Sequence, residues 1–69
     1  MKSNLQYLAK WCHAMGYSIR IGLNNLTIRY KTKTMYANID NINNMNKESF
    51  AEYRELITWY MEDKINEKR

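Results

Sequence analysis

The chain has no proline, two glycines and one cysteine in 69 residues. Gly16 and Gly22 are too few for a phosphate-binding P-loop or a dinucleotide fingerprint, because both motifs need several closely spaced glycines. A single cysteine excludes an internal disulfide and a cysteine-based zinc site within one chain. No apolar run approaches the ~20 residues of a membrane span, and the N-terminus lacks the continuous apolar centre of a secretory signal. We therefore expect a cytoplasmic protein without a cofactor.

Catalytic and metal-binding side chains are also scarce. The chain has one histidine, His13, and its acidic residues all fall between Asp40 and Glu67. His13 adjoins Cys12, but adjacent residues on a helix point roughly 100° apart, and no nearby carboxylate completes a metal site with them. We expect Cys12 to be buried as a small apolar residue and His13 to be half exposed. We also expect no catalytic residue, no metal site and no enzymatic activity.

The residues that are present are typical of one small folded domain, residues 1–69, with 45% hydrophobic and 26% charged residues. A first helix is predicted over residues 4–15. Ser3 and Gln6 fit a capping box at its start, and Gly16 supplies a left-handed stop at its end. An apolar stripe at helical spacing lies between them and consists of Leu5, Leu8, Cys12 and Met15.

From residue 17 the period of the apolar residues changes to two, which indicates β-strands over residues 17–23 and 26–31. Asparagine tolerates the positive φ of a tight hairpin turn, so a two-residue loop is predicted at 24–25. A second turn near Thr32 returns residues 34–40 as a third strand. In this register Arg20 lies opposite Arg29, and Arg29 lies beside Tyr36. These three side chains would form a row on the polar face of the sheet.

The asparagine-rich segment 41–46 (NINNMN) is predicted to be a loop, and Asn46 is predicted to cap a final helix. Met45 and Phe50 are placed to form a hydrophobic staple at its start. One face of this helix should lie on the sheet, and it comprises Phe50, Tyr53, Leu56, Ile57, Tyr60, Met61 and Ile65. The opposite face surrounds Trp59 with acidic residues, namely Glu48, Glu52, Glu55, Glu62 and Asp63.

The predicted fold class is α+β, a two-layer domain in which a three-stranded antiparallel β-meander carries an N-terminal and a C-terminal helix on one face (α-β-β-β-α). The other face of the sheet stays open and is cationic, because residues 1–39 carry six basic and no acidic side chains. We expect this face to bind a partner or nucleic acid through Arg20, Arg29, Lys31, Lys33, Tyr36 and Asn38. The alternative is a solvated face whose charges keep sheets from stacking on one another.

A second candidate interface lies on the acidic face of the final helix. A tryptophan at the centre of an acidic stripe is hard to bury in a monomer, and tryptophan is enriched among the residues that dominate binding energy. The alternative is a ring that lies over the aliphatic stems of its neighbours. The candidate residues are Trp59, Glu52, Glu55 and Glu62.

The element order is similar to that of the double-stranded RNA-binding domain. That family has a glycine-proline-histidine loop and a lysine cluster at its final helix, whereas this chain has GLNNL and Lys47 alone, so no residue role carries over. Element order, small size and a composition typical of AT-rich coding DNA also resemble small phage anti-CRISPR proteins. That resemblance implies a protein that occupies the nucleic-acid or partner surface of a Cas effector.

Three functions remain open at this point. The first is a phage or mobile-element inhibitor or regulator that occupies a surface of a nucleic-acid-handling partner. The second, which is the main alternative to the first, is direct DNA or RNA binding by the basic sheet face. The third is a structural protomer that forms a homodimer or larger oligomer through Trp59 and Tyr7. No membrane partner is expected.

Overall fold

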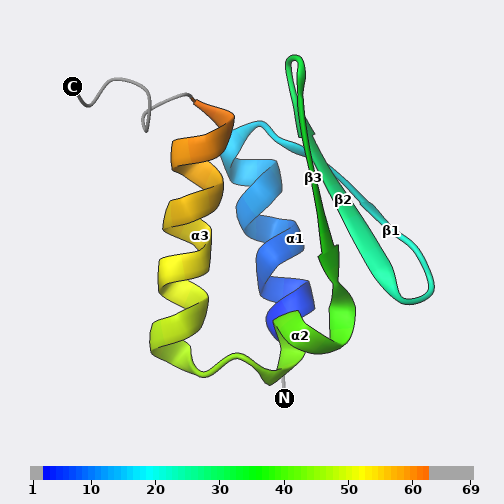
Figure 1. The fold of residues 1–69 in the computed structure, drawn as a ribbon, viewed down its shortest axis with the longest axis vertical. Helices are drawn as coiled ribbons and strands as arrows, with labels where there is room; N and C mark the ends of the chain where they lie inside the picture. The colour runs from blue at the N-terminus through cyan, green and yellow to red at the C-terminus, as the bar shows by residue number, and fades with distance from the viewer. Residues whose placement is uncertain (1–2, 63–69) are drawn as a thin grey trace.

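The computed structural model describes residues 3–62. Helix α1 spans Asn4–Met15 and is followed by strands β1 (Ser18–Ile21), β2 (Asn25–Tyr30) and β3 (Lys33–Asn38), and by helices α2 (Ile39–Asn44) and α3 (Lys47–Met61). The strands form one antiparallel sheet in the order β1-β2-β3 (Figure 1). The predicted α+β class with a three-stranded antiparallel meander is confirmed, and the short helix α2 is an addition to it.

Side-chain caps define the ends of the two long helices. The Ser3 hydroxyl accepts a hydrogen bond from the Gln6 N–H at 3.2 Å, and Gly16 ends α1 with a φ of 84°, a left-handed conformation that suits glycine. The Asn46 side chain accepts a hydrogen bond from the Ser49 N–H at 2.7 Å at the start of α3. The predicted capping roles of Ser3, Gly16 and Asn46 are therefore confirmed.

The segment predicted as a loop is partly helical. Helix α2 covers residues 39–44, and its N-cap is Asn38, whose side-chain oxygen accepts a hydrogen bond from the Asn41 N–H at 3.1 Å. The third strand therefore ends at Asn38 rather than at Asp40. Asparagine is favoured both in loops and at helix caps, so its abundance did not distinguish them. Ile42 anchors the short helix because its side chain is buried in the core.

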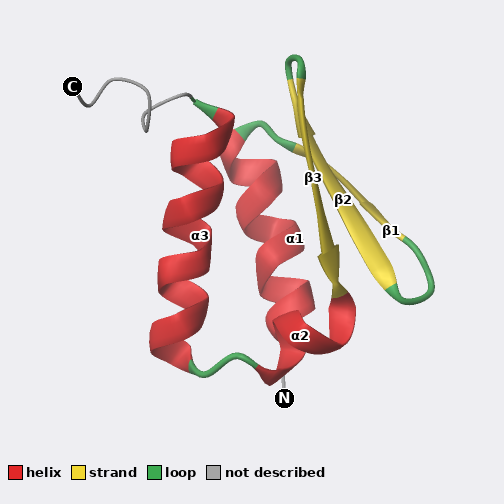
Figure 2. Ribbon diagram, viewed as in Figure 1, coloured by secondary structure: helices red, strands yellow, loops and turns green. Residues whose placement is uncertain are grey.

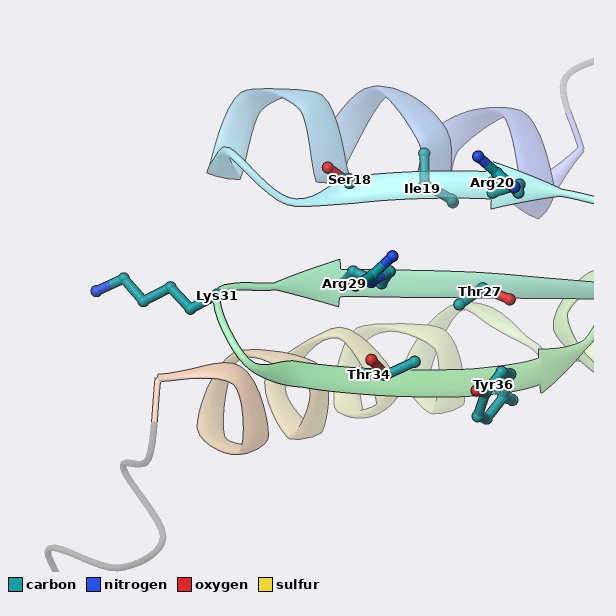
Figure 3. Close-up of a pocket in the computed structure, with 8 residues that line it drawn as sticks. All are labelled: Ser18, Ile19, Arg20, Thr27, Arg29, Lys31, Thr34 and Tyr36. Carbon is teal, nitrogen blue, oxygen red and sulfur yellow. The ribbon is translucent and has the colours of Figure 1, made fainter.

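Both long helices pack against the same face of the sheet, as predicted (Figure 2). α1 packs on β1 and α3 packs on β3, as the view from the opposite side of the sheet shows (Figure 3), and the core fills the space between the layers. The predicted apolar arc of α3 is too broad, because Leu56 and Tyr60 are 50% and 40% exposed. Ile65 and Asp63 lie outside the described residues. The buried side chains are Leu8, Cys12, Tyr17, Leu26, Ile28, Ile42, Phe50, Ile57 and Met61.

The strand register differs from the predicted register by two residues in both hairpins. Arg20 pairs with Thr27 rather than with Arg29, and Tyr36 also pairs with Thr27. Because strand side chains alternate, a shift of two residues leaves each of them on its predicted face. The predicted row of Arg20, Arg29 and Tyr36 is nevertheless wrong, since Arg29 lies between Ser18 and Thr34.

The turns explain this shift. The Gly22 N–H donates a hydrogen bond to the Asn25 carbonyl at 2.8 Å, so the first loop consists of Leu23 and Asn24. The second loop is Lys31-Thr32, and Lys31 has a φ of 57°. No asparagine in the described part of the chain has a positive φ. The primed turn predicted at Asn24-Asn25 is therefore wrong.

Candidate binding face of the sheet

The outer face of the sheet, opposite the helices, presents two cross-strand rows of polar side chains. One row runs Arg20–Thr27–Tyr36 and the other runs Ser18–Arg29–Thr34. Arg29, on the central strand, is therefore diagonal to both Arg20 and Tyr36, a relation that places Cα atoms about 7–8 Å apart. Figure 3 shows these side chains on one face, with both helices on the far side of the sheet.

This outer face is open and hollowed. Its exposed residues include both arginines, Lys31 and Tyr36, and Tyr36 is 76% exposed. The depression has a volume of about 750 Å³, and Lys31 extends from the β2–β3 turn at one end of it (Figure 3). Strands β1 to β3 contain no acidic residue, so the arginines have no carboxylate partner within the sheet. The lining residues are Ser18, Ile19, Arg20, Thr27, Arg29, Lys31, Thr34 and Tyr36.

Three predicted residues of the face make contacts elsewhere, and for Lys31 this is an ammonium 5.3 Å from the centre of the Tyr30 ring. The Lys33 ammonium donates a hydrogen bond to the Tyr60 carbonyl at 3.2 Å and lies 4.9 Å from the centre of the Tyr60 ring, on the helix side of the sheet. Asn38 caps α2. The structure thus brings together Arg20, Arg29, Lys31 and Tyr36, and it places Lys33 and Asn38 outside this group.

The second predicted interface is spread over α3. Trp59 is 40% exposed. Glu62 accepts a hydrogen bond from the Tyr17 hydroxyl at 2.8 Å, which ties it to the helix–sheet junction. Glu52 and Glu55 line a smaller hollow of about 400 Å³ between α1 and α3, and Trp59 is not among its lining residues. Among these predicted residues, Glu62 is therefore engaged at the junction, whereas Trp59 stays partly exposed on α3.

An arginine between aromatic rings links the two long helices beside this smaller hollow. The Arg54 guanidinium lies 4.9 Å from the Tyr7 ring centre and 5.1 Å from that of Phe50. These distances are typical of cation–π contacts. Its buried Nε has no hydrogen-bond partner within residues 3–62. Arg54 therefore acts as a packing element, which its charge alone did not indicate.

The titratable groups with shifted pKa values are on the helix side of the sheet. Burial raises the pKa of the Cys12 thiol to about 11, in agreement with the predicted buried apolar role. Burial, together with the hydrogen bond to Glu62, raises the pKa of Tyr17 to about 12. Both shifts favour the neutral forms of these groups. Cys12 therefore stays a thiol at neutral pH, and a thiol is a poor nucleophile. His13 is exposed, and residues 3–62 contain no cluster of metal-ligating side chains.

The predicted register gave the wrong neighbours to the small polar residues that separate the charged and aromatic side chains of this face. Thr27 lies directly between Arg20 and Tyr36, while Ser18 and Thr34 flank Arg29. Their polar character at alternate positions indicated the face but not the neighbours. A second feature that was missed is the hairpin tip, where Leu23 is 96% exposed.

Comparison with known proteins gives no match to a family model, to a curated protein or to a solved structure. Within the described residues, no helix is sufficiently long and apolar to cross a membrane. The functional assignment therefore depends on the geometry and charge of the outer face.

Proposed function

We propose that this chain is a non-enzymatic binding protein of the cytoplasm that binds nucleic acid on the outer face of its sheet. The observation that carries the proposal is the set of exposed cations on an open face without acidic residues, namely Arg20, Arg29 and Lys31. Arginine and lysine side chains supply most phosphate contacts in protein–nucleic acid complexes.

The spacing of these cations favours a polymer over a small anion. Arg20 pairs with Thr27, so the three charges sit at positions equivalent to 27, 29 and 31 of the central strand and the turn that follows it. At about 3.4 Å per strand residue they extend over roughly 14 Å, too far for one phosphate to contact all of them. A chain of phosphates at about 3.4 Å per nucleotide in a stacked strand covers that length.

A salt series measures this electrostatic contribution. Binding of labelled mixed-sequence DNA and RNA should weaken steeply as salt rises, because each neutralised phosphate releases counterions. Arg29→Ala should make the slope of log K against log salt shallower by about 0.7–0.9. Lys10→Ala on the exposed side of α1 removes the same charge and should leave the slope near that of the wild type. Absence of binding at low salt, or equal effects of the two variants, would contradict the proposal.

A second candidate is an inhibitor or regulator, of phage or mobile-element origin, that occupies a surface of a nucleic-acid-handling protein. The exposed Trp59 supports it, since a 40% exposed tryptophan suits a protein contact. Tyr60 is equally exposed and provides a matched control. Co-purification of a protein partner that is lost with Trp59→Ala and kept with Tyr60→Ala would favour this candidate, and equal effects would count against it.

A further inference from the structure

The tyrosine on the outer face, Tyr36, combines high exposure with the absence of any ring–ring or cation–ring contact among residues 3–62, whereas Tyr53, which also lacks such a contact, packs against the core. Ring–ring and cation–ring contacts within residues 3–62 involve Tyr7, Tyr17, Tyr30 and Tyr60. Tyr36 makes none of these contacts, and its side chain is 76% exposed. A large ring that adds nothing to the core and stands on an open surface is available to stack on a planar ligand.

The strand pairing places one small side chain and two arginines beside the exposed Tyr36. Its pairing partner is Thr27, a small side chain, and Arg20 follows on the next strand. Arg29 is diagonal to Tyr36 at a Cα distance of about 7–8 Å. A base stacked on the ring would thus have a guanidinium within reach of its flanking phosphates.

These features favour single-stranded over double-stranded nucleic acid. The faces of bases inside a duplex are covered by their neighbours, so an exposed ring has no stacking partner there. Unpaired bases offer a π-face to aromatic side chains whatever their sequence. The cationic set is also small, and its three charges predict a salt slope of only about −2 for a single strand. Stacking is therefore needed to supplement the phosphate contacts.

We propose that the outer face binds single-stranded nucleic acid, with one base stacked on Tyr36 and the sugar–phosphate chain following β2 past Arg29 towards Lys31. This proposal rests on the proposed function and specifies its ligand. Sequence preference is weak in this arrangement, because stacking and phosphate contacts do not read base edges.

The test compares a labelled oligothymidylate of about 12 nucleotides, within the usual site sizes of roughly 4–16, with a mixed-sequence duplex of equal length. Fluorescence anisotropy at fixed low salt should give tighter binding to the single strand. Tyr36→Thr should weaken that binding about 5-fold to 150-fold, the range measured for the loss of one aromatic stacking contact. Tyr36→Phe keeps the ring and should bind as the wild type does. Both variants should keep the wild-type unfolding midpoint, since the side chain is 76% exposed.

The outcomes separate this inference from the proposed function. Equal or tighter binding of the duplex, or an unchanged affinity of Tyr36→Thr for the oligothymidylate, would overturn single-strand stacking while leaving nucleic-acid binding intact. Failure of both probes to bind at low salt would overturn both proposals. A preference for the single strand that depends on the ring would support both.

Discussion

The two faces of the sheet have different physical roles, and β2 shows this most clearly. Leu26 and Ile28 point to the helices and are 1% and 0% exposed, whereas Arg29 on the outer face is exposed and Thr27 is half-buried. The inner residues bury apolar surface away from water, and this burial is the main contribution that stabilises the fold. The outer residues contribute little to the core and are therefore free to serve binding.

The faces also differ in how polar groups are satisfied. On the inner side, the Tyr17 hydroxyl donates a hydrogen bond to Glu62, and burial raises the pKa of Tyr17 to about 12. On the outer side, Arg20 and Arg29 face solvent without a carboxylate in the strands. Uncompensated charge of one sign adds nothing to folding but increases the rate of encounter with an anionic partner.

The largest difference between the faces should appear in stability. Ile28→Ala removes a fully buried side chain and should lower the free energy of unfolding by about 2–5 kcal/mol. Arg29→Ala, one residue further along the same strand, should change it by no more than about 0.5 kcal/mol. Urea unfolding followed by circular dichroism measures both. A loss of similar size at the two positions would remove the distinction between the faces.

A smaller loss of unfolding free energy should appear at alkaline pH, and it arises from a buried group on the inner side of the sheet. Cys12 has an ordinary pKa of 9.0, which burial raises to about 11 in the folded state. The unfolded chain therefore loses this proton first, and stability falls as pH rises from about 9 towards 11. The loss should reach about 2 kcal/mol.

Cys12→Ala isolates this contribution. The substitution itself can change stability at neutral pH, so absolute stabilities are not compared. The quantity to compare is the change in unfolding free energy between about pH 8 and about pH 11, which bracket the pKa shift of Cys12. The variant should lose less than the wild type over that interval. An identical pH dependence would show that the thiol is not kept neutral by burial.

The sequence was sufficient to predict the face of most strand residues, with Lys33 as an exception, but not the pairing between strands. Alternation has a period of two, so a register displaced by two residues satisfies the hydrophobic pattern equally well. The turns decide between such registers. The first loop consists of Leu23 and Asn24, and the positive φ falls on Lys31, a residue type that gives no turn signal.

Alternation also explains why the residues of the candidate binding face were predicted only in part. Arg20, Arg29, Lys31 and Tyr36 share the outer face as expected, because face depends only on alternation and on the turn position. Lys33 is directed to Tyr60 instead, since the turn ends one residue earlier than predicted and Lys33 becomes the first residue of β3. Contacts such as this depend on register and helix position together, which the sequence does not specify.

A substitution in the second turn should raise the stability of the fold while it weakens nucleic-acid binding. Lys31 has a φ of 57°, which is costly for a residue with a side chain. Lys31→Gly should raise the unfolding free energy by about 0.5–1 kcal/mol and weaken nucleic-acid binding by removing one cation. Thr32→Gly, at the neighbouring turn position without a positive φ, should lower stability instead. Thermal unfolding and anisotropy on the same samples test both effects, and a stability loss in Lys31→Gly would contradict the strain.

The smallest expected change in stability comes from adding one negative charge to the outer face. Thr34 lies directly opposite Arg29, so Thr34→Glu would create a cross-strand ion pair. Such a pair contributes about 0.2–1 kcal/mol, and the lower strand propensity of glutamate offsets a similar amount. The unfolding free energy should therefore stay within about 0.5 kcal/mol of the wild type. Oligothymidylate binding should nevertheless weaken and its salt slope become shallower, because the new carboxylate competes with phosphate for Arg29. Unchanged binding in this variant would show that the Arg29 guanidinium does not contact the ligand.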